Sequence, residues 1–223
     1  MSTIVEQLKR IKDTLPPEVC LVAVSKFHPA ESIREAYDAG QRVFGESKAQ
    51  ELVQKKALLP DDIQWHFIGH LQSNKIKYIA PFVAMIHSID SFKLLAEVDK
   101  FAAKENRIIN CLLQIHVAKE ETKFGFLPDE CVGMLREGLW RGLKNIRICG
   151  IMGMASLTED QTQIREEFAT LASLFRDLKE MFFADDAAFK EISMGMSHDY
   201  QLALEKGSTM VRIGSSIFGE RVY

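Results

Sequence analysis

A lysine stands at the end of the first strongly apolar stretch of the chain. Residues 19–24 are five aliphatic residues and one cysteine, and Ser25 and Lys26 follow them directly. Such a short apolar run, bounded by prolines, is typical of a buried strand. An amine held among apolar groups loses its proton more readily, and a neutral amine can form a Schiff base with a carbonyl. Lys26 is therefore a candidate attachment point, with an ordinary solvated strand end as the alternative.

Two segments near the C-terminus combine glycine with hydroxyl side chains. They read SMGMS at residues 193–197 and RIGSS at residues 212–216. Glycine lets a ligand approach the backbone, and free N–H groups at a helix start favour an anion. We expect the first segment to be a turn that opens into a helix capped by Ser197. Either segment alone could be an ordinary turn, but two of them on neighbouring strands favour phosphate binding.

Arg212 lies inside a short apolar run at residues 210–213. Alternation along a strand can turn its side chain inward, where a guanidinium could donate to a pyridine nitrogen. A phosphate or a structural carboxylate is the alternative partner. Together with a Schiff-base lysine and a phosphate site, this pattern indicates a carbonyl-bearing phosphate ester. Pyridoxal phosphate fits, and so does the sugar phosphate of an aldolase.

The elements that must position these residues alternate between strand and helix. Strands are expected at residues 19–26, 42–44, 64–68, 83–86, 108–117, 146–151, 189–193 and 210–213. Helices are expected at residues 2–13, 29–39, 47–58, 74–79, 91–101, 128–138, 160–182 and 197–206. Eight alternating units predict a single (β/α)8 TIM barrel of class α/β with an extra N-terminal helix, in one domain spanning residues 1–223. An open doubly wound sheet is the alternative, although no GxGxxG follows the first strand.

Composition excludes several classes of protein. The net charge of the 223 residues is -3, which does not favour nucleic acid or an anionic membrane as a partner. No apolar run approaches the ~18 residues that span a bilayer, and the charged N-terminus does not resemble a signal peptide. The four cysteines form no CxxC pair and are expected to be buried free thiols. These features indicate a reduced compartment, the cytoplasm.

Several long motifs occur in a fixed order: VAVSKFHP, FGESKAQEL, WHFIGHLQSNK, HSID, KFGF, SMGMSHDYQLALEKGS and VRIGSSIFG. They resemble the pyridoxal-phosphate homeostasis protein family, whose fold is similar to the barrel domain of alanine racemase. The resemblance implies that pyridoxal phosphate is held on Lys26 as an internal aldimine, with Arg212 at the ring nitrogen. It implies phosphate contacts from Ser193, Ser197, Gly214 and Ser215. Met194 and Met196 could form a wall of the site, although packing within a strand explains them equally well.

Two positions depart from the family pattern. The family usually has asparagine after FGE and in the fifth-strand motif, where this chain has Ser47 and His116. Either change could alter contacts near the ring. Neither affects the lysine or the phosphate segments.

The resemblance implies a role in vitamin B6 supply, without catalytic turnover. Apoenzymes that depend on pyridoxal phosphate are candidate recipients, and we expect a monomer. The alternatives are an amino-acid racemase and, less favoured, a Schiff-base aldolase. In alanine racemase the second base is a tyrosine from a further domain, for which no room remains after the eighth strand. The tyrosines before Tyr223 fall in expected helices, at Tyr37, Tyr78 and Tyr200.

Histidines offer little evidence for a metal. His66 and His70 are four residues apart, but Gly69 and a strand end lie between them, so their rings need not face one another. His87 and His116 are expected to be hydrogen-bonded histidines at strand ends, with a place at the mouth of the barrel as the alternative for each. We therefore predict no metal site.

Overall fold

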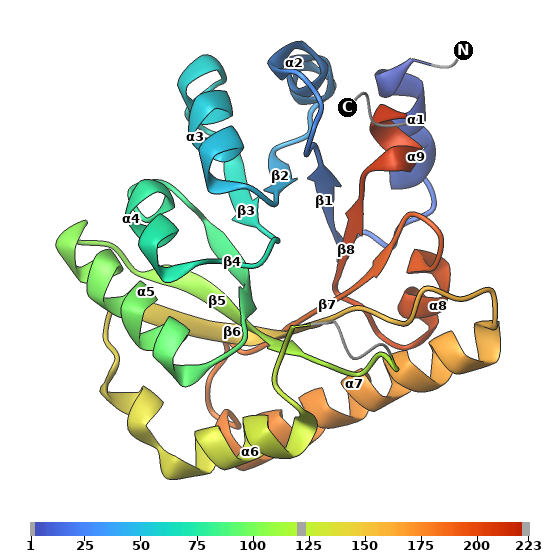
Figure 1. Cartoon of the computed structure of the whole chain (residues 1–223). Coiled ribbons are helices and arrows are strands. Elements are labelled where there is room, and N and C mark those ends of the chain that lie inside the picture. The colour runs from blue at the N-terminus through green and yellow to red at the C-terminus, as the bar shows by residue number, and fades with distance from the viewer. Residues whose placement is uncertain (1–2, 120–123, 220–223) are drawn as a thin grey trace.

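Eight parallel strands close into a barrel in the computed structural model, which describes residues 3–119 and 124–219 (Figure 1). The strands follow the order of the chain: β1 Cys20–Val24, β2 Val43–Glu46, β3 Gln64–Phe67, β4 Met85–Ile89, β5 Ile109–Ile115, β6 Ile146–Gly153, β7 Glu191–Met196 and β8 Met210–Ile213. Parallel pairing of β1 with β8, from Cys20 opposite Met210 to Ala23 opposite Ile213, closes the ring. The predicted TIM barrel is confirmed.

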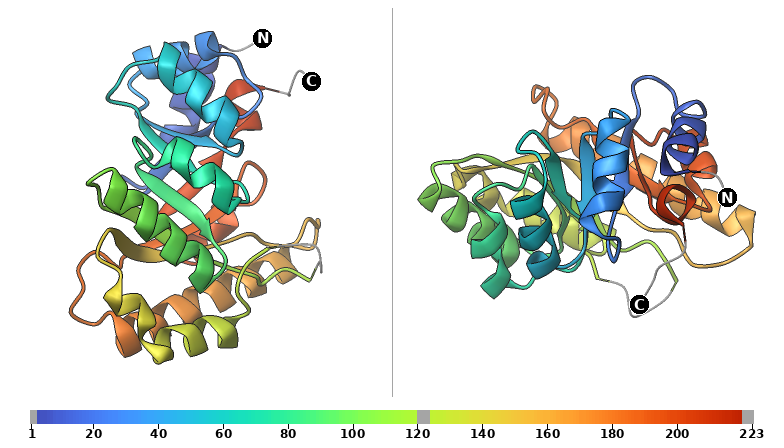
Figure 2. Two further views of the ribbon diagram at one scale, coloured as in Figure 1. Left: turned by 60° about the vertical axis from the view of Figure 1, so that its left-hand side comes forward. Right: turned by 90° about the horizontal axis from the view of Figure 1, so that it is seen from above.

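Helices cover the outside of the barrel (Figures 1 and 2). They are α1 Ile4–Lys12, α2 Ala30–Asp38, α3 Ala49–Leu58, α4 Ile76–Ile79, α5 Phe92–Lys104, α6 Pro128–Glu137, α7 Gln161–Phe182, α8 Tyr200–Glu205 and α9 Ser215–Phe218. Two 3₁₀ turns, η1 Ser73–Lys75 and η2 Leu139–Gly142, complete the connections. The expected extra helix is α1, which begins in a capping box between Thr3 and Glu6 and packs beside α9. No helix among the described residues is long and apolar enough to cross a membrane.

Some element boundaries near the C-terminus differ from the prediction. β7 starts at Glu191 and continues through Gly195 to Met196, so most of the expected SMGMS turn is strand. The expectation that Ser197 caps the next helix is wrong, because α8 has Asp199 at its N-cap position. The carboxylate of Asp199 instead accepts a hydrogen bond from the backbone of Met196, at 2.6 Å, and shapes the turn. The short helix α9 follows β8 and was not expected.

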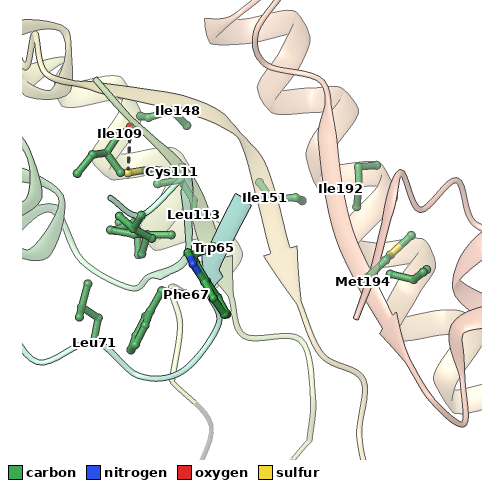
Figure 3. Close-up of a cluster of buried hydrophobic side chains, with 14 of the residues drawn as sticks. Trp65, Phe67, Leu71, Ile109, Cys111, Leu113, Ile148, Ile151, Ile192 and Met194 are labelled. Carbon is green, nitrogen blue, oxygen red and sulfur yellow. Dashed lines mark hydrogen bonds between the residues drawn. The ribbon is translucent and has the colours of Figure 1, made fainter. Parts of the chain in front are cut away.

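Alternation along each strand separates two apolar layers. One side belongs to the larger buried cluster of the molecule, which includes Trp65, Phe67, Leu113 and Ile151 (Figure 3). The other side fills the barrel with a smaller cluster comprising Val22, Met85, Leu112, Cys149, Met152 and Met210. The cysteines are free, and three of the four are buried, with Cys20 partly exposed. The barrel is thus a packed core, and the space for a ligand lies at one end of it.

The longest helix, α7, contributes Phe168 to the outer layer, where the side chain is fully buried. We expect Phe168→Ala to lower the free energy of unfolding by about 3–5 kcal/mol, because it leaves a cavity that the barrel cannot fill. Urea denaturation measures this change. Met181→Ala on the same helix is the matched control, since Met181 is 48% exposed and should cost less than about 1 kcal/mol. Equal losses for the two variants would contradict this packing.

Candidate functional site

A cavity of about 370 Å³ opens at the carboxyl ends of the strands. Its lining includes six of the seven residues predicted from the sequence: Lys26, Met196, Ser197, Arg212, Gly214 and Ser215. The seventh, Ser193, is fully buried and is not among the lining residues. Ligand sites of TIM barrels lie at this end, so the position of the cavity agrees with the fold.

Lys26 lies in a tight turn that follows β1. β1 ends at Val24, and the turn closes with a hydrogen bond from the backbone N–H of His28 to the carbonyl of Ser25. Within it, Phe27 has φ 67°, a left-handed conformation that is uncommon for a bulky residue. Its backbone N–H donates to Glu51 Oε1 at 2.6 Å, which stabilises that conformation. The turn therefore projects Lys26 into the cavity from a defined backbone.

A buried ionic cluster supports this turn from below. Lys55 of α3 donates from Nζ, at 2.7 Å in each case, to the carbonyl of Ser25 and to Oε1 of both Glu46 and Glu51. Ser25 Oγ donates to Glu46 Oε1 at 2.6 Å. Burial raises the pKa of Glu46 to about 6, and the opposing charge of Lys55 limits the rise. The cluster ties the end of β1 to the end of β2 and to α3.

Arg212 enters the cavity from β8, as alternation along that strand predicts. Its NH1 donates to the carbonyl of Ser193 at 2.8 Å and to Ser193 Oγ at 2.6 Å, while NH2 donates to the carbonyl of Gly153 at 2.9 Å. Burial lowers its pKa to about 10, so the guanidinium remains charged at neutral pH. Arg212 therefore presents a fixed positive charge to the cavity.

The two glycine-serine segments meet at the cavity wall because β7 and β8 are neighbours. The backbone N–H of Gly214 donates to Ser197 Oγ at 3.3 Å. A Cβ atom on Gly214 would lie 3.0 Å from the carbonyl oxygen of Val24, so glycine permits close approach to β1 here. Ser215 follows at the start of α9. Hydroxyl and backbone N–H groups thus gather on the side of the cavity next to Lys26.

Besides His70, which the sequence offered only as a metal ligand beside His66, the mouth of the cavity contains residues that the sequence did not single out. His70 stacks on Phe124, with ring centroids 4.0 Å apart, and both line the cavity together with Gln114 and His198. These residues follow strand ends or belong to a strand, but nothing in their spacing indicated that they would meet. Gln114 donates to the carbonyl of Phe124 at 2.7 Å and holds that residue at the mouth.

The two positions that depart from the family pattern differ in their relation to the cavity. Ser47 lines the cavity. The backbone of Ser47 lies so close to Gly69 that a Cβ atom added at Gly69 would be 2.2 Å from the Ser47 carbonyl oxygen. His116 is not among the lining residues, and its Nε2 lies 2.8 Å from the carbonyl oxygen of Ala118. Of the two changes, only that at Ser47 falls on the cavity wall.

A histidine pair lies inside the barrel beneath the cavity. Nδ1 of His66 lies 2.9 Å from Nε2 of His87, and Nδ1 of His87 lies 3.1 Å from Ser193 Oγ. The spacing in the sequence suggests a pair of His66 with His70, but the structure pairs His66 with His87. Among the described residues there is no group of three His, Cys, Asp or Glu side chains that could hold a metal ion.

Comparison with known proteins gives consistent matches over nearly the whole chain. The family model of the alanine racemase N-terminal domain matches residues 1–222. A protein of Aquifex aeolicus named pyridoxal phosphate homeostasis protein is 40% identical, covering 91% of this chain and 87% of its own length. The human protein of the same name is 38% identical, covering 96% of this chain and 81% of its own length.

Solved structures agree with these matches. PipY of Synechococcus elongatus, in a structure with pyridoxal phosphate bound, is 36% identical and superposes with a TM-score of 0.88 over 97% of this chain and all of its own. Alanine racemase of Clostridium difficile superposes with a TM-score of 0.78 at 12% identity, covering 98% of this chain and 56% of its own, and shows the shared fold. The chain belongs to the pyridoxal phosphate homeostasis protein family, within the alanine racemase N-terminal domain family.

Proposed function

We propose that this protein binds pyridoxal phosphate and takes part in maintaining its supply in the cell. The observation that carries the proposal is the meeting of Lys26, Arg212 and the two glycine-serine segments around one cavity. The names of the relatives and the bound ligand of PipY support it. In this proposal Lys26 is the covalent attachment point, and Arg212 faces the ring nitrogen.

The donor groups of the cavity suit the parts of this ligand. Hydroxyl and backbone N–H groups of Ser197, Gly214 and Ser215 are of the type that binds phosphate oxygens. The fixed guanidinium of Arg212 can donate to an unprotonated pyridine nitrogen. Met196 adds an apolar wall. When bound, pyridoxal phosphate supplies an aldehyde that amines can capture, and the chain supplies one such amine at Lys26.

The wider setting of this activity also belongs to the proposal. We infer that residues 1–223 act as one domain, as a monomer, in the cytoplasm, with apoenzymes that need pyridoxal phosphate as the recipients. The single closed barrel of the described residues supports the one-domain organisation. The net charge of -3 supports a function without nucleic acid.

Removing one hydroxyl from the phosphate side tests the orientation of the ligand. Ser197→Ala and Ser215→Ala should each weaken pyridoxal phosphate about tenfold or more, because a hydrogen bond to a charged group contributes about 1.5–3 kcal/mol. Binding of pyridoxal, which lacks the phosphate, should change much less. Titrations followed by the change in the visible absorption of each ligand on attachment to the protein measure both affinities.

Ser73→Ala is the matched control for these variants, since Ser73 is exposed in η1 and does not line the cavity. It should bind both ligands as the unmodified protein does. Equal weakening of pyridoxal phosphate and pyridoxal by the cavity variants would mean that these hydroxyls do not contact the phosphate.

We expect very poor racemase activity, because racemisation needs a base on each face of the ligand. The described tyrosines, Tyr37, Tyr78 and Tyr200, do not line the cavity. The hydroxyl of Tyr37 donates to Asp62 at 2.7 Å, and that of Tyr200 lies 3.0 Å from Thr14 Oγ1. A ring nitrogen that accepts from Arg212 also withdraws electrons less well than a protonated one.

Incubation with L-alanine in deuterium oxide measures this activity. Exchange at the α-carbon and loss of optical rotation should be far slower than the ordinary kcat range of ~1–10³ per second. Rapid exchange within that range would instead favour a racemase.

A further inference from the structure

Four buried polar side chains form a continuous chain of contacts across the barrel interior. His66 of β3 contacts His87 of β4, His87 contacts Ser193 of β7, and Ser193 contacts Arg212 of β8, at 2.9, 3.1 and 2.6 Å. Each of the four side chains is at most 4% exposed. Arg212 is the member that lines the cavity, so the other three act on the cavity through it.

Hydrogen-bonding chemistry gives this chain a direction. A guanidinium can only donate, so Ser193 Oγ accepts from Arg212 and its own proton remains available for His87 Nδ1. His87 then donates from Nε2 to His66 Nδ1. This arrangement requires both imidazoles to be neutral. Burial lowers the pKa of His66 to about 4, and burial together with the positive charge of Arg212 holds the pKa of His87 well below its ordinary value.

The same contacts restrict the guanidinium of Arg212. NH1 is directed to Ser193 and NH2 to the carbonyl of Gly153 on β6, so both terminal nitrogens have fixed partners. The hydroxyl of Ser193 is in turn oriented by His87. If His87 could not accept, that hydroxyl proton would be left without an acceptor among these contacts, and the orientation of Oγ toward Arg212 would no longer be fixed.

We propose that Ser193, His87 and His66 are positioning residues that fix Arg212 as the donor to the ring nitrogen of the bound ligand. This inference rests on the proposed binding of pyridoxal phosphate and assigns Ser193 to the ring side of the ligand instead of the phosphate. The three residues touch Arg212 or one another and need not touch the ligand. They determine how strongly the site distinguishes a ring that has an acceptor nitrogen from one that lacks it.

The test compares two ligand pairs in binding titrations. The first pair is pyridoxal phosphate and its deaza analogue, in which a C–H group replaces the ring nitrogen. The unmodified protein should prefer pyridoxal phosphate by about tenfold or more, the size of one charged hydrogen bond. The second pair, pyridoxal phosphate and pyridoxal, reports on the phosphate contacts alone.

Ser193→Ala and His87→Phe should bring the preference for the ring nitrogen close to one and leave the preference for the phosphate unchanged. His87→Asn should keep most of the ring preference, because its amide oxygen can still accept from Ser193. Ser88→Ala is the matched control on the same strand, since the Ser88 hydroxyl is buried and has no hydrogen-bond partner among the described residues. It should leave both preferences unchanged.

Thermal unfolding of each variant checks that the barrel is intact, and Ser193→Ala carries the test alone if His87→Phe does not fold. If the variants lowered the affinities for pyridoxal phosphate and for its deaza analogue equally, these residues would have only a general structural role, and the inference would be overturned. Loss of the phosphate preference in Ser193→Ala would also overturn it. Absence of any binding by the unmodified protein would overturn the proposed binding of pyridoxal phosphate itself. Binding without ring discrimination would leave that binding standing and would overturn the contact of Arg212 with the ring nitrogen, and with it this inference.

Discussion

The pairing of β1 with β8 is the contact on which the arrangement of the site depends. It joins strands that are nearly the whole chain apart, and it sets Val22 opposite Arg212 in the barrel interior. The turn of Lys26 therefore lies beside the segment of Gly214 and Ser215, whose backbone passes close to Val24. In an open sheet, these two strands would lie far apart, and the attachment point and the anion-binding groups would not share a cavity.

The position of Lys26 also depends on charges buried beneath it. Lys55 is 6% exposed and Glu46 is fully buried, so their contact is made away from water. Moving two charges out of water costs free energy. The attraction between the paired charges often does no more than offset that cost. Glu46 Oε2 has no hydrogen-bond partner among the described residues, which is consistent with the raised pKa of this carboxyl. We interpret the cluster as a device that fixes the turn at Lys26 more than as a source of stability.

Much of this architecture could be predicted from the sequence because it depends on local periodicity. Alternating strands and helices indicated the barrel, and the two-residue period of a strand placed Arg212 in its interior. The end of β7 could not be predicted in the same way. Gly195 has φ 95° and resembles a turn residue in the sequence, but the strand continues through it with a shifted register to β8. Ser193 therefore lies within β7, where its hydroxyl accepts a hydrogen bond from Arg212 and does not line the cavity.

Contacts between side chains on distant strands could not be predicted from the sequence either, for a different reason. His66, His87 and Ser193 lie on three strands, and local patterns do not show which inward-facing polar side chains meet. His70 and Phe124 at the mouth are a similar case, since the backbone of Phe124 is held by a hydrogen bond from Gln114 of β5. Such pairs are determined by register and by the shape of the closed barrel.

The central claim is that Lys26 is the covalent attachment point for pyridoxal phosphate. The protein is incubated with one equivalent of pyridoxal phosphate, reduced with borohydride, digested and mapped by mass spectrometry. The label should be found mainly on the peptide that contains Lys26, because Lys26 lines the same cavity as Arg212, Ser197 and Ser215. A label located mainly on another lysine, such as Lys48 or Lys75, would contradict the account.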